Sequence, residues 1–270
     1  MAAALGGHKS VGTTFASGAA SATTAAFATT GGANTVVDVQ VSWYNNGGQT
    51  APTGVTLNGN ACTLVGSIQS YSGDTKFRTA LYRIIGAAGS GSSTATATFA
   101  AGQAAISVWA VEAVNCDTAA ITTAYVEDDV SPYASSSVSP STGALLVAFL
   151  LSGGVSGTET IVWGNSFTAI SGDTITDLDN NLTGGPASRT VSAGTYNSSH
   201  TSSAGGTNLA LLFLVAYPDA GGASASDPVE SAARRQLRQN SGYRMSPRTE
   251  HEAQQFLRAR KRAYGFAAHA

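Results

Sequence analysis

Cysteines and long apolar runs are both scarce in this sequence. The chain of 270 residues has two cysteines, Cys62 and Cys116, which are too few for a disulfide framework or for a zinc site of four sulfurs. We interpret them as small buried hydrophobic residues, with a single disulfide between them as the alternative. The longest apolar runs, at 144–151 and 209–217, are shorter than the roughly 20 residues of a membrane-spanning helix. The sequence therefore predicts a soluble chain with no membrane contact.

Sequence signatures of common enzymes and of secretion are missing as well. The chain has no Gly-x-Ser-x-Gly elbow, no Gly-x-x-x-x-Gly-Lys phosphate loop and no His-Glu-x-x-His helix. His200, in NSSHTSSAGG, is interpreted as a solvated loop histidine and not as a general base, because serine is too abundant here for adjacency to matter. The opening MAAALGGHK has no positive charge before an apolar run, so it does not predict a secretory signal. We expect a non-enzymatic protein without a cofactor.

Charged residues are few, and the two signs are unevenly distributed. Residues 1–218 hold five basic and eleven acidic side chains, a net charge of −6, whereas residues 219–270 hold nine basic and five acidic side chains, a net charge of +4. The whole chain has a formal net charge of −2. Positive charge for contact with a partner is therefore concentrated at the end of the chain.

What the sequence does contain is a series of short strand-like segments separated by turn residues. Residues 35–44, TVVDVQVSWY, alternate valines and Trp43 with polar residues from Asp38 to Ser42, the period of two that is typical of a half-buried strand. This segment ends at Asn-Asn-Gly-Gly, a turn signal because Asn and Gly tolerate positive φ. About a dozen such segments predict an all-β fold, a two-layer antiparallel β-sandwich over residues 1–218.

Two features of these segments predict which parts are buried. Residues 144–151, ALLVAFLL, are apolar on both faces, so we expect a central strand with one face on the core and the other under a loop, the C-terminal segment or a neighbouring subunit. A buried helix is the alternative interpretation of this run. Trp43 and Trp109 lie in strongly alternating segments, which places both in the predicted core.

The order of the segments also resembles a known family. The order runs from TTFASGAASATTAAFATTGGANTVVDVQVSWY, through GVTLNGNACTLVGS and RTALYRIIGAAGSGSSTATATFAAGQAAISVWAVEAV, to STGALLVAFLL and LALLFLVAY. In this order the chain resembles, over residues 10–217, the β-sandwich domains of jelly-roll type found in tailed-bacteriophage virion proteins and some bacterial surface proteins. The resemblance implies a virion component, either a capsid decoration or a tail- or fibre-associated protein, made in the host cytoplasm. It implies other virion proteins as partners and a homo-oligomer within the particle, and it carries over no catalytic residue.

An acidic segment matches a calcium loop only in part. Asp177, Asp179 and Asn181 offer oxygen ligands at alternate positions, as a calcium loop does. Leu182 and Ser188, however, occupy the positions where that loop has a glycine and a bidentate glutamate. We therefore interpret the segment as Asx turns in an exposed connection and predict no metal site.

Carbohydrate binding is the alternative function. Sandwich domains bind sugars on exposed aromatic rings, and Tyr133 and Tyr196 lie in segments that the sequence predicts to be loops. These two tyrosines are the candidate glycan-binding residues of a host-surface adhesin. The lack of a secretory signal argues against a secreted protein of that kind.

The last part of the chain predicts helices. Residues 219–226 are interpreted as a flexible Gly/Ala/Ser linker and residues 227–270 as a basic arm of two short α-helices. One helix begins at Asp227-Pro228 and the other at Ser246-Pro247, where capping residues precede arginines that fall late in each helix.

Each predicted helix carries only a narrow apolar stripe, so it is marginal in isolation and needs a surface to lie on. We therefore predict a docking arm whose arginines pair with carboxylates of another subunit. The predicted docking residues are Val229, Leu237, Phe256, Leu257, Tyr264, Arg258, Arg260, Lys261 and Arg262. A solvated extension is one alternative. Nucleic-acid binding is the other, which the interleaved acidic residues Glu250 and Glu252 disfavour.

Overall fold

Not every part of the chain is described by the computed structural model. The described residues are 1–10, 16–45, 50–71, 74–86, 91–128, 132–153, 160–170, 172–177, 182–202 and 209–220. They belong to one compact unit, Met1–Gly222, and a second unit comprises Ala223–Ala270. The predicted docking arm and all nine of its docking residues lie outside the described residues, as does most of the predicted linker.

Two central sheets contain the longest strands, and all strand pairs in them are antiparallel. Central sheet 1 has the order β1 (Ala4–Ser10), β11 (Ala105–Val114), β4 (Val36–Tyr44), β8 (Asp74–Ile85), β7 (Thr63–Tyr71). Central sheet 2 has the order β12 (Thr122–Asp128), β20 (Leu209–Pro218), β14 (Ala144–Gly153), β18 (Leu182–Val191), β16 (Thr168–Ala169), and β17 (Ile175–Asp177) also pairs with β18.

Shorter strands form three further sheets. Cover sheet 1 has the order β2 (Ser21–Thr23), β10 (Ala95–Phe99), β5 (Pro52–Leu57), β6 (Asn60–Ala61). Cover sheet 2 has the order β13 (Tyr133–Ala134), β19 (Ser199–Ser202), β15 (Ile161–Trp163). β3 (Phe27–Thr29) pairs with β9 (Gly91–Ser93). The described residues are therefore all-β and antiparallel, as the sequence predicts. No helix that could span a membrane is found among them.

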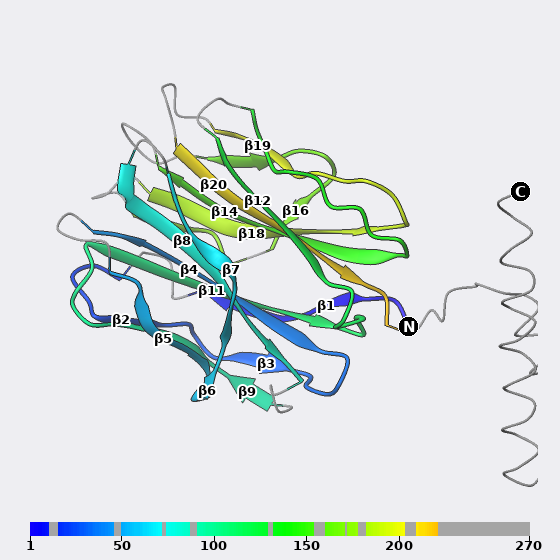
Figure 1. Cartoon of the computed structure of the whole chain (residues 1–270), viewed down its shortest axis with the longest axis horizontal. Helices are drawn as coiled ribbons and strands as arrows, with labels where there is room; N and C mark the ends of the chain where they lie inside the picture. Colours follow the sequence, from blue (N-terminus) through cyan, green and yellow to red (C-terminus); the bar gives the residue numbers. More distant parts are fainter. Residues whose placement is uncertain are drawn as a thin grey trace, which may run out of the picture. The chain divides into compact units, whose positions relative to one another are not determined.

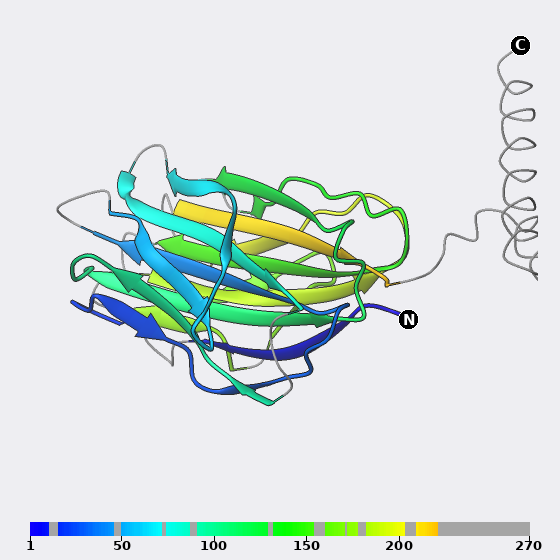
Figure 2. The ribbon, with the colours of Figure 1, turned by 60° about the horizontal axis from the view of Figure 1, so that its bottom comes forward.

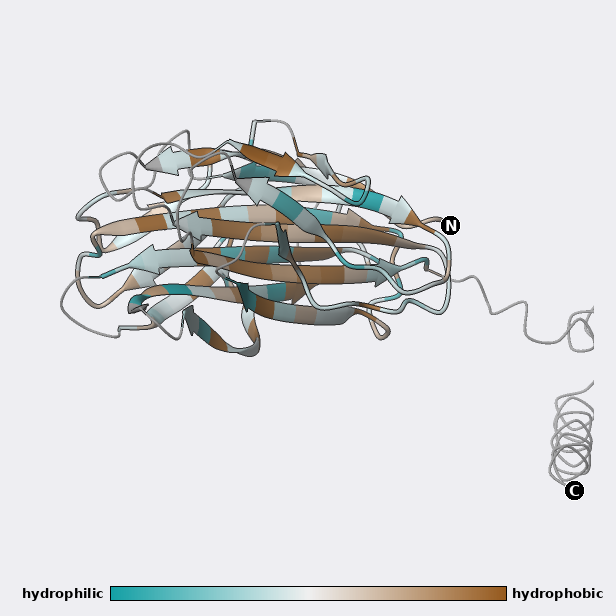
Figure 3. Ribbon diagram, turned by 90° about the horizontal axis from the view of Figure 1, so that it is seen from above, coloured by the Kyte–Doolittle hydropathy of each residue, from teal (hydrophilic) through white to brown (hydrophobic). Residues whose placement is uncertain are grey.

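The sheets stack in four layers rather than the two that we expected (Figures 1 and 2). The inner faces of the central sheets share one core, to which Trp109 and Leu81 contribute from one side and Phe149 and Phe213 from the other. The opposite face of central sheet 1 packs on cover sheet 1, and the opposite face of central sheet 2 packs on cover sheet 2. The two-layer expectation fails because both central sheets are buried on both faces. Figure 3 shows the resulting concentration of hydrophobic residues along the interior strands.

The alternating segment 35–44 forms β4, as predicted, but it is not half-buried. The valine face of β4 packs under cover sheet 1 with Trp43, whose ring meets Phe99 edge to face at 5.5 Å between centroids. The polar face, from Asp38 to Ser42, is also fully buried, because central sheet 2 covers it. The predicted burial of Trp43 and Trp109 is confirmed.

The doubly apolar segment 144–151 forms β14, which lies between β20 and β18 as a central strand. Its residues Phe149 and Leu151 point into the shared core, whereas Leu146 and Ala148 pack against cover sheet 2 and its loops. The prediction of a central strand is confirmed, and the covering element is a part of the same chain.

The two ends of the described body lie together. The N-terminal amino group of Met1 donates a hydrogen bond to the Ala220 carbonyl at 3.0 Å, and the Ala3 amide donates to the Asp219 carboxylate at 2.7 Å. The amides of Asp219 and Ala220 in turn donate to Gly143 and Asn115. The body therefore includes Asp219 and Ala220, two residues beyond the predicted boundary at 218.

Candidate functional site

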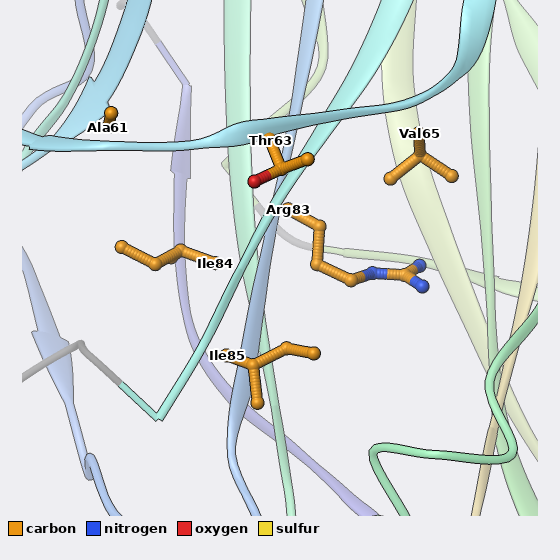
Figure 4. Close-up of a pocket in the computed structure, with 6 residues that line it drawn as sticks. All are labelled: Ala61, Thr63, Val65, Arg83, Ile84 and Ile85. Atoms are coloured by element: carbon orange, nitrogen blue, oxygen red, sulfur yellow. The ribbon is translucent and has the colours of Figure 1, made fainter.

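A groove lies along the β7 edge of central sheet 1. It has a volume of about 340 Å³ and is lined by Ala61, Thr63, Val65, Arg83, Ile84 and Ile85. Figure 4 shows Thr63, Val65 and Ile85 near the Arg83 side chain, whereas the Ile84 side chain extends away from it. Ile85 is 49 % exposed, and Leu64, on the opposite face of β7, is 37 % exposed. This edge of the body therefore exposes aliphatic surface.

The charge in this groove is already neutralised by a buried acid. The Arg83 guanidinium donates two hydrogen bonds to the Asp38 carboxylate, each of 2.7 Å. The Tyr217 hydroxyl donates to the same carboxylate at 2.6 Å, and the Arg83 guanidinium lies 6.0 Å from the Tyr217 ring centre. Burial alone would lower the pKa of Arg83, but the charge and hydrogen bonds of Asp38 outweigh it and raise the pKa. The groove therefore suits apolar side chains better than an anion.

This ion pair belongs to a polar band on the inner face of central sheet 1. Thr79 links the band, because its hydroxyl accepts a hydrogen bond from Gln40 at 3.0 Å and lies 2.8 Å from the Ser42 hydroxyl. The Gln40 carbonyl oxygen and the Ser107 hydroxyl have no hydrogen-bond partner among the described residues. The groove residue Arg83 thus connects the surface to the polar centre of the body.

A row of three aromatic side chains crosses cover sheet 2. His200 in β19 lies directly opposite Tyr133 in β13 on one side and Trp163 in β15 on the other. Its imidazole stacks on the Tyr133 ring, with 4.6 Å between centroids, and lies 5.9 Å from the Trp163 ring. Directly opposed residues of neighbouring strands point to the same face, and this face packs on β14 and β20.

This row corrects two predictions. His200 is 1 % exposed in a strand, not solvated in a loop, and neither of its ring nitrogens has a hydrogen-bond partner among the described residues. Burial lowers the pKa of His200 to about 4. Tyr133 is fully buried rather than exposed in a loop, so it presents no ring face to a sugar. Both predictions failed because the strands that bury these residues are too short to show a pattern in the sequence.

The other candidate for glycan binding keeps part of its ring accessible. Tyr196 is partly exposed, and the Arg189 guanidinium lies 5.2 Å from its ring centre. Arg189 also donates a hydrogen bond to the Asn165 carbonyl at 2.8 Å. The structure therefore separates the two predicted glycan residues: Tyr133 lies inside the fold and Tyr196 lies at its surface.

A second histidine, His8, contacts a carboxylate in a way that the sequence did not reveal. The His8 Nδ1 atom in β1 lies 2.5 Å from the Asp173 carboxylate. The backbone carbonyl of Asp173 accepts a hydrogen bond of 2.7 Å from the Trp109 indole. Burial raises the pKa of Asp173, and His8 opposes this shift. These contacts fasten the edge strand of central sheet 1 to central sheet 2, which is a structural role.

Neither the cysteines nor the described part of the predicted acidic connection forms a reactive site. Cys62 and Cys116 are both free thiols; Cys116 is buried as predicted, and Cys62 is half-buried. Burial raises the pKa of the Cys62 thiol to about 12 and that of Cys116 to about 11, which keeps both protonated at neutral pH. Asp179 and Asn181 lie outside the described residues, and within the described ranges no three acidic, cysteine or histidine side chains are grouped to hold a metal ion.

No protein-family model matches the chain, and no curated protein matches its sequence.

Proposed function

We propose that the protein is a non-enzymatic structural component of a tailed-phage virion. It would serve as a capsid decoration or as a tail- or fibre-associated protein, with a jelly-roll-like body held to the particle by residues 227–270. Other virion proteins are its proposed partners, and it would form a homo-oligomer within the particle.

The observation that carries this proposal is the division of the chain into two units, Met1–Gly222 and Ala223–Ala270. Asp219 and Ala220, near the end of the first unit, are hydrogen-bonded beside Met1, so the two ends of the described body are joined. From residue 219 the chain has a net charge of +4 against −6 before it. A closed acidic body followed by a basic segment fits a displayed module with its own attachment segment.

Carbohydrate binding remains the second function to be tested, and the structure weakens it. Of its two candidate residues, Tyr133 is fully buried and Tyr196 is partly covered by Arg189. A sugar site on the body would therefore need other aromatic side chains. Binding of residues 1–220 to a glycan array, without association of the full chain with particles, would favour this function.

The decisive experiment is the location of the protein. Particles produced from the genome that encodes the chain are purified by density gradient, and their proteins are identified by mass spectrometry. We expect the full chain in the particles in a fixed copy number. Its absence from purified particles would contradict the proposal.

The attachment segment is tested by sedimentation of the full chain with those particles. Replacing Phe256 and Leu257 by alanine should release the protein, because desolvated apolar anchors contribute more than screened ion pairs at a rim. The matched control is Gln254→Ala with Gln255→Ala, which should leave binding unchanged. If attachment is to nucleic acid, replacement of Arg258, Arg260, Lys261 and Arg262 will instead abolish it, and binding will fall steeply with salt.

A further inference from the structure

The aromatic row of cover sheet 2 contains a buried histidine, His200, whose hydrogen-bonding atoms are unsatisfied within the described part of the chain. His200 is 1 % exposed, and both of its ring nitrogens lack a hydrogen-bond partner among the described residues. A neutral imidazole has one N–H donor and one acceptor, so its burial without partners is unfavourable. The neutral ring is stabilised as an aromatic group, because its centroid lies 4.6 Å from that of Tyr133, on which it stacks, and 5.9 Å from that of Trp163. The same position is unfavourable for the protonated imidazolium, because burial separates it from water and from a counter-ion.

The elements around His200 supply little that could compensate a positive charge. β14 and β20 present Leu150, Ala210 and Leu212 to this face, and none of these can ionise. From β13 the titratable group is Tyr133, and from β12 it is Asp128, whose carboxylate accepts a hydrogen bond of 3.3 Å from the Ala134 amide. The charged residue of β18 on this side of the sheet is Arg189, which also packs on Tyr196. β15 and β19 contribute no other acidic or basic side chain.

We propose that cover sheet 2 is an acid-sensitive layer, which opens away from central sheet 2 when His200 takes up a proton. The layer is suited to local opening because its three strands are short and pair only with one another. It has one exposed face, on which Val162 is 57 % exposed, and its other face rests on β14 and β20. Opening gives the imidazolium access to water and uncovers the apolar outer face of those two strands, including Leu150 and Leu212. Acidification thereby converts a closed surface into a hydrophobic one, whatever the protein is attached to.

The direction of the pH dependence follows from the depressed pKa. An exposed histidine has its ordinary pKa of 6.5, and burial lowers the pKa of His200 to about 4. The closed layer is therefore fully stabilised above pH 6.5, and its stability falls as the pH drops from 6.5 towards 4. The equilibrium constant for opening rises about tenfold per pH unit over that window, which is about 30-fold between pH 7.5 and pH 5.

The test is hydrogen exchange of the full chain at pH 7.5, 6 and 5, expressed as protection factors so that the intrinsic pH dependence of exchange is removed. We expect the amides of residues 133–138, 161–163 and 199–202 to lose about 30-fold in protection at pH 5, while those of β4 do not change. His200→Phe keeps an aromatic ring in the row and should remove this acid sensitivity. His8→Gln is the matched control, since it removes the other histidine of the described body and should leave the sensitivity intact.

Three results would overturn the proposal: a wild-type layer with equal protection at pH 7.5 and 5, acid sensitivity that persists in His200→Phe, or sensitivity that His8→Gln abolishes. If His200→Phe does not fold, the wild-type full chain decides the question by NMR titration of its histidine side chains. A His200 resonance that titrates near 6.5 in the folded protein contradicts the proposal, and one that titrates well below 5 while the layer opens supports it.

Discussion

The central strands β4 and β14 are both buried, yet their inner faces differ in chemistry. The inner face of β14 presents aliphatic and aromatic side chains from Leu145 to Leu151, whereas that of β4 presents Asp38, Gln40 and Ser42. All of these are at most 2 % exposed. The apolar face needs only close packing, but each polar group of β4 loses water and must find a partner within the fold.

The difference shows that strand periodicity reports the chemistry of a face and not its exposure. An alternating strand is commonly half-buried, but the partners of β4 include Arg83 from β8 and Tyr217 from β20, which satisfy Asp38 inside the core. The polar band thereby joins the two central sheets by the hydrogen bond from Tyr217 to Asp38, whereas β14 joins them by packing. The stability of the polar side of the interface should therefore depend on pairs of residues, and that of the apolar side on single ones.

The largest effect is expected when the polar band loses one partner. Arg83→Met leaves the Asp38 carboxylate buried without its counter-charge, which should lower the free energy of unfolding by about 3–5 kcal/mol. Adding Asp38→Asn removes the charge and keeps an acceptor for Tyr217, so the double variant should be more stable than Arg83→Met alone. Urea denaturation of the wild type, Arg83→Met, Asp38→Asn and the double variant gives the coupling energy between Arg83 and Asp38. Arg189→Met, at a partly exposed arginine, is the control and should cost less than about 1 kcal/mol. Simple additivity in the cycle would contradict a paired polar band.

The apolar side should respond to a single truncation, with a loss of stability that is comparable or smaller. Leu151→Ala, on the inner face of β14, should lower the free energy of unfolding by about 2–5 kcal/mol, because it removes buried methyl groups and leaves a cavity. Leu64→Ala makes the same change at a side chain that is 37 % exposed and should cost less than about 1 kcal/mol. Thermal and urea unfolding of both variants measure the contrast. Equal losses at the two positions would mean that the shared core does not exclude water from Leu151.

The sequence predicted the long strands because each carries its own pattern. Nine residues of alternation define β4, and the doubly apolar run defines β14 as a central strand. Cover sheet 2 could not be predicted, since β13, β15 and β19 contain two to four residues each. A strand that short shows no period, and its identity comes from pairing between positions far apart in the chain, such as Tyr133 with His200.

The same limit applies to the candidate sites. The burial of His200 and Tyr133 is a property of their pairing, so a local interpretation as loops was wrong for both. The His8 contact with Asp173 joins residues 165 positions apart, and no sequence motif predicts it. The groove beside Arg83 likewise arises where two strands meet, although its aliphatic residues are visible as strand residues in the sequence. The chemistry of each side chain at these sites can be read from the sequence, but the residues that the fold brings next to it cannot.

The smallest effect is expected from removal of the basic segment, provided that the cut keeps Asp219 and Ala220. A chain that ends at Ala220 keeps the hydrogen bonds of Ala220 to Met1 and Asn115 and those of Asp219 to Ala3 and Gly143. Its free energy of unfolding should stay within about 0.5 kcal/mol of that of the full chain, as for changes away from buried contacts. Calorimetry of the two chains measures the difference.

A chain that ends at Pro218, two residues earlier, is the matched comparison. It loses all four of these hydrogen bonds, each of which contributes about 0.5–1.5 kcal/mol net. Because the bonds lie at a chain end, where part of their contribution is lost to fraying, we expect a loss of about 1–3 kcal/mol relative to the chain that ends at Ala220. If the two truncated chains are equally stable, Asp219 and Ala220 do not belong to the body. If the chain ending at Ala220 is itself insoluble or lacks a cooperative transition, the body needs residues beyond 220, and the division of the chain that supports the proposed attachment segment is wrong.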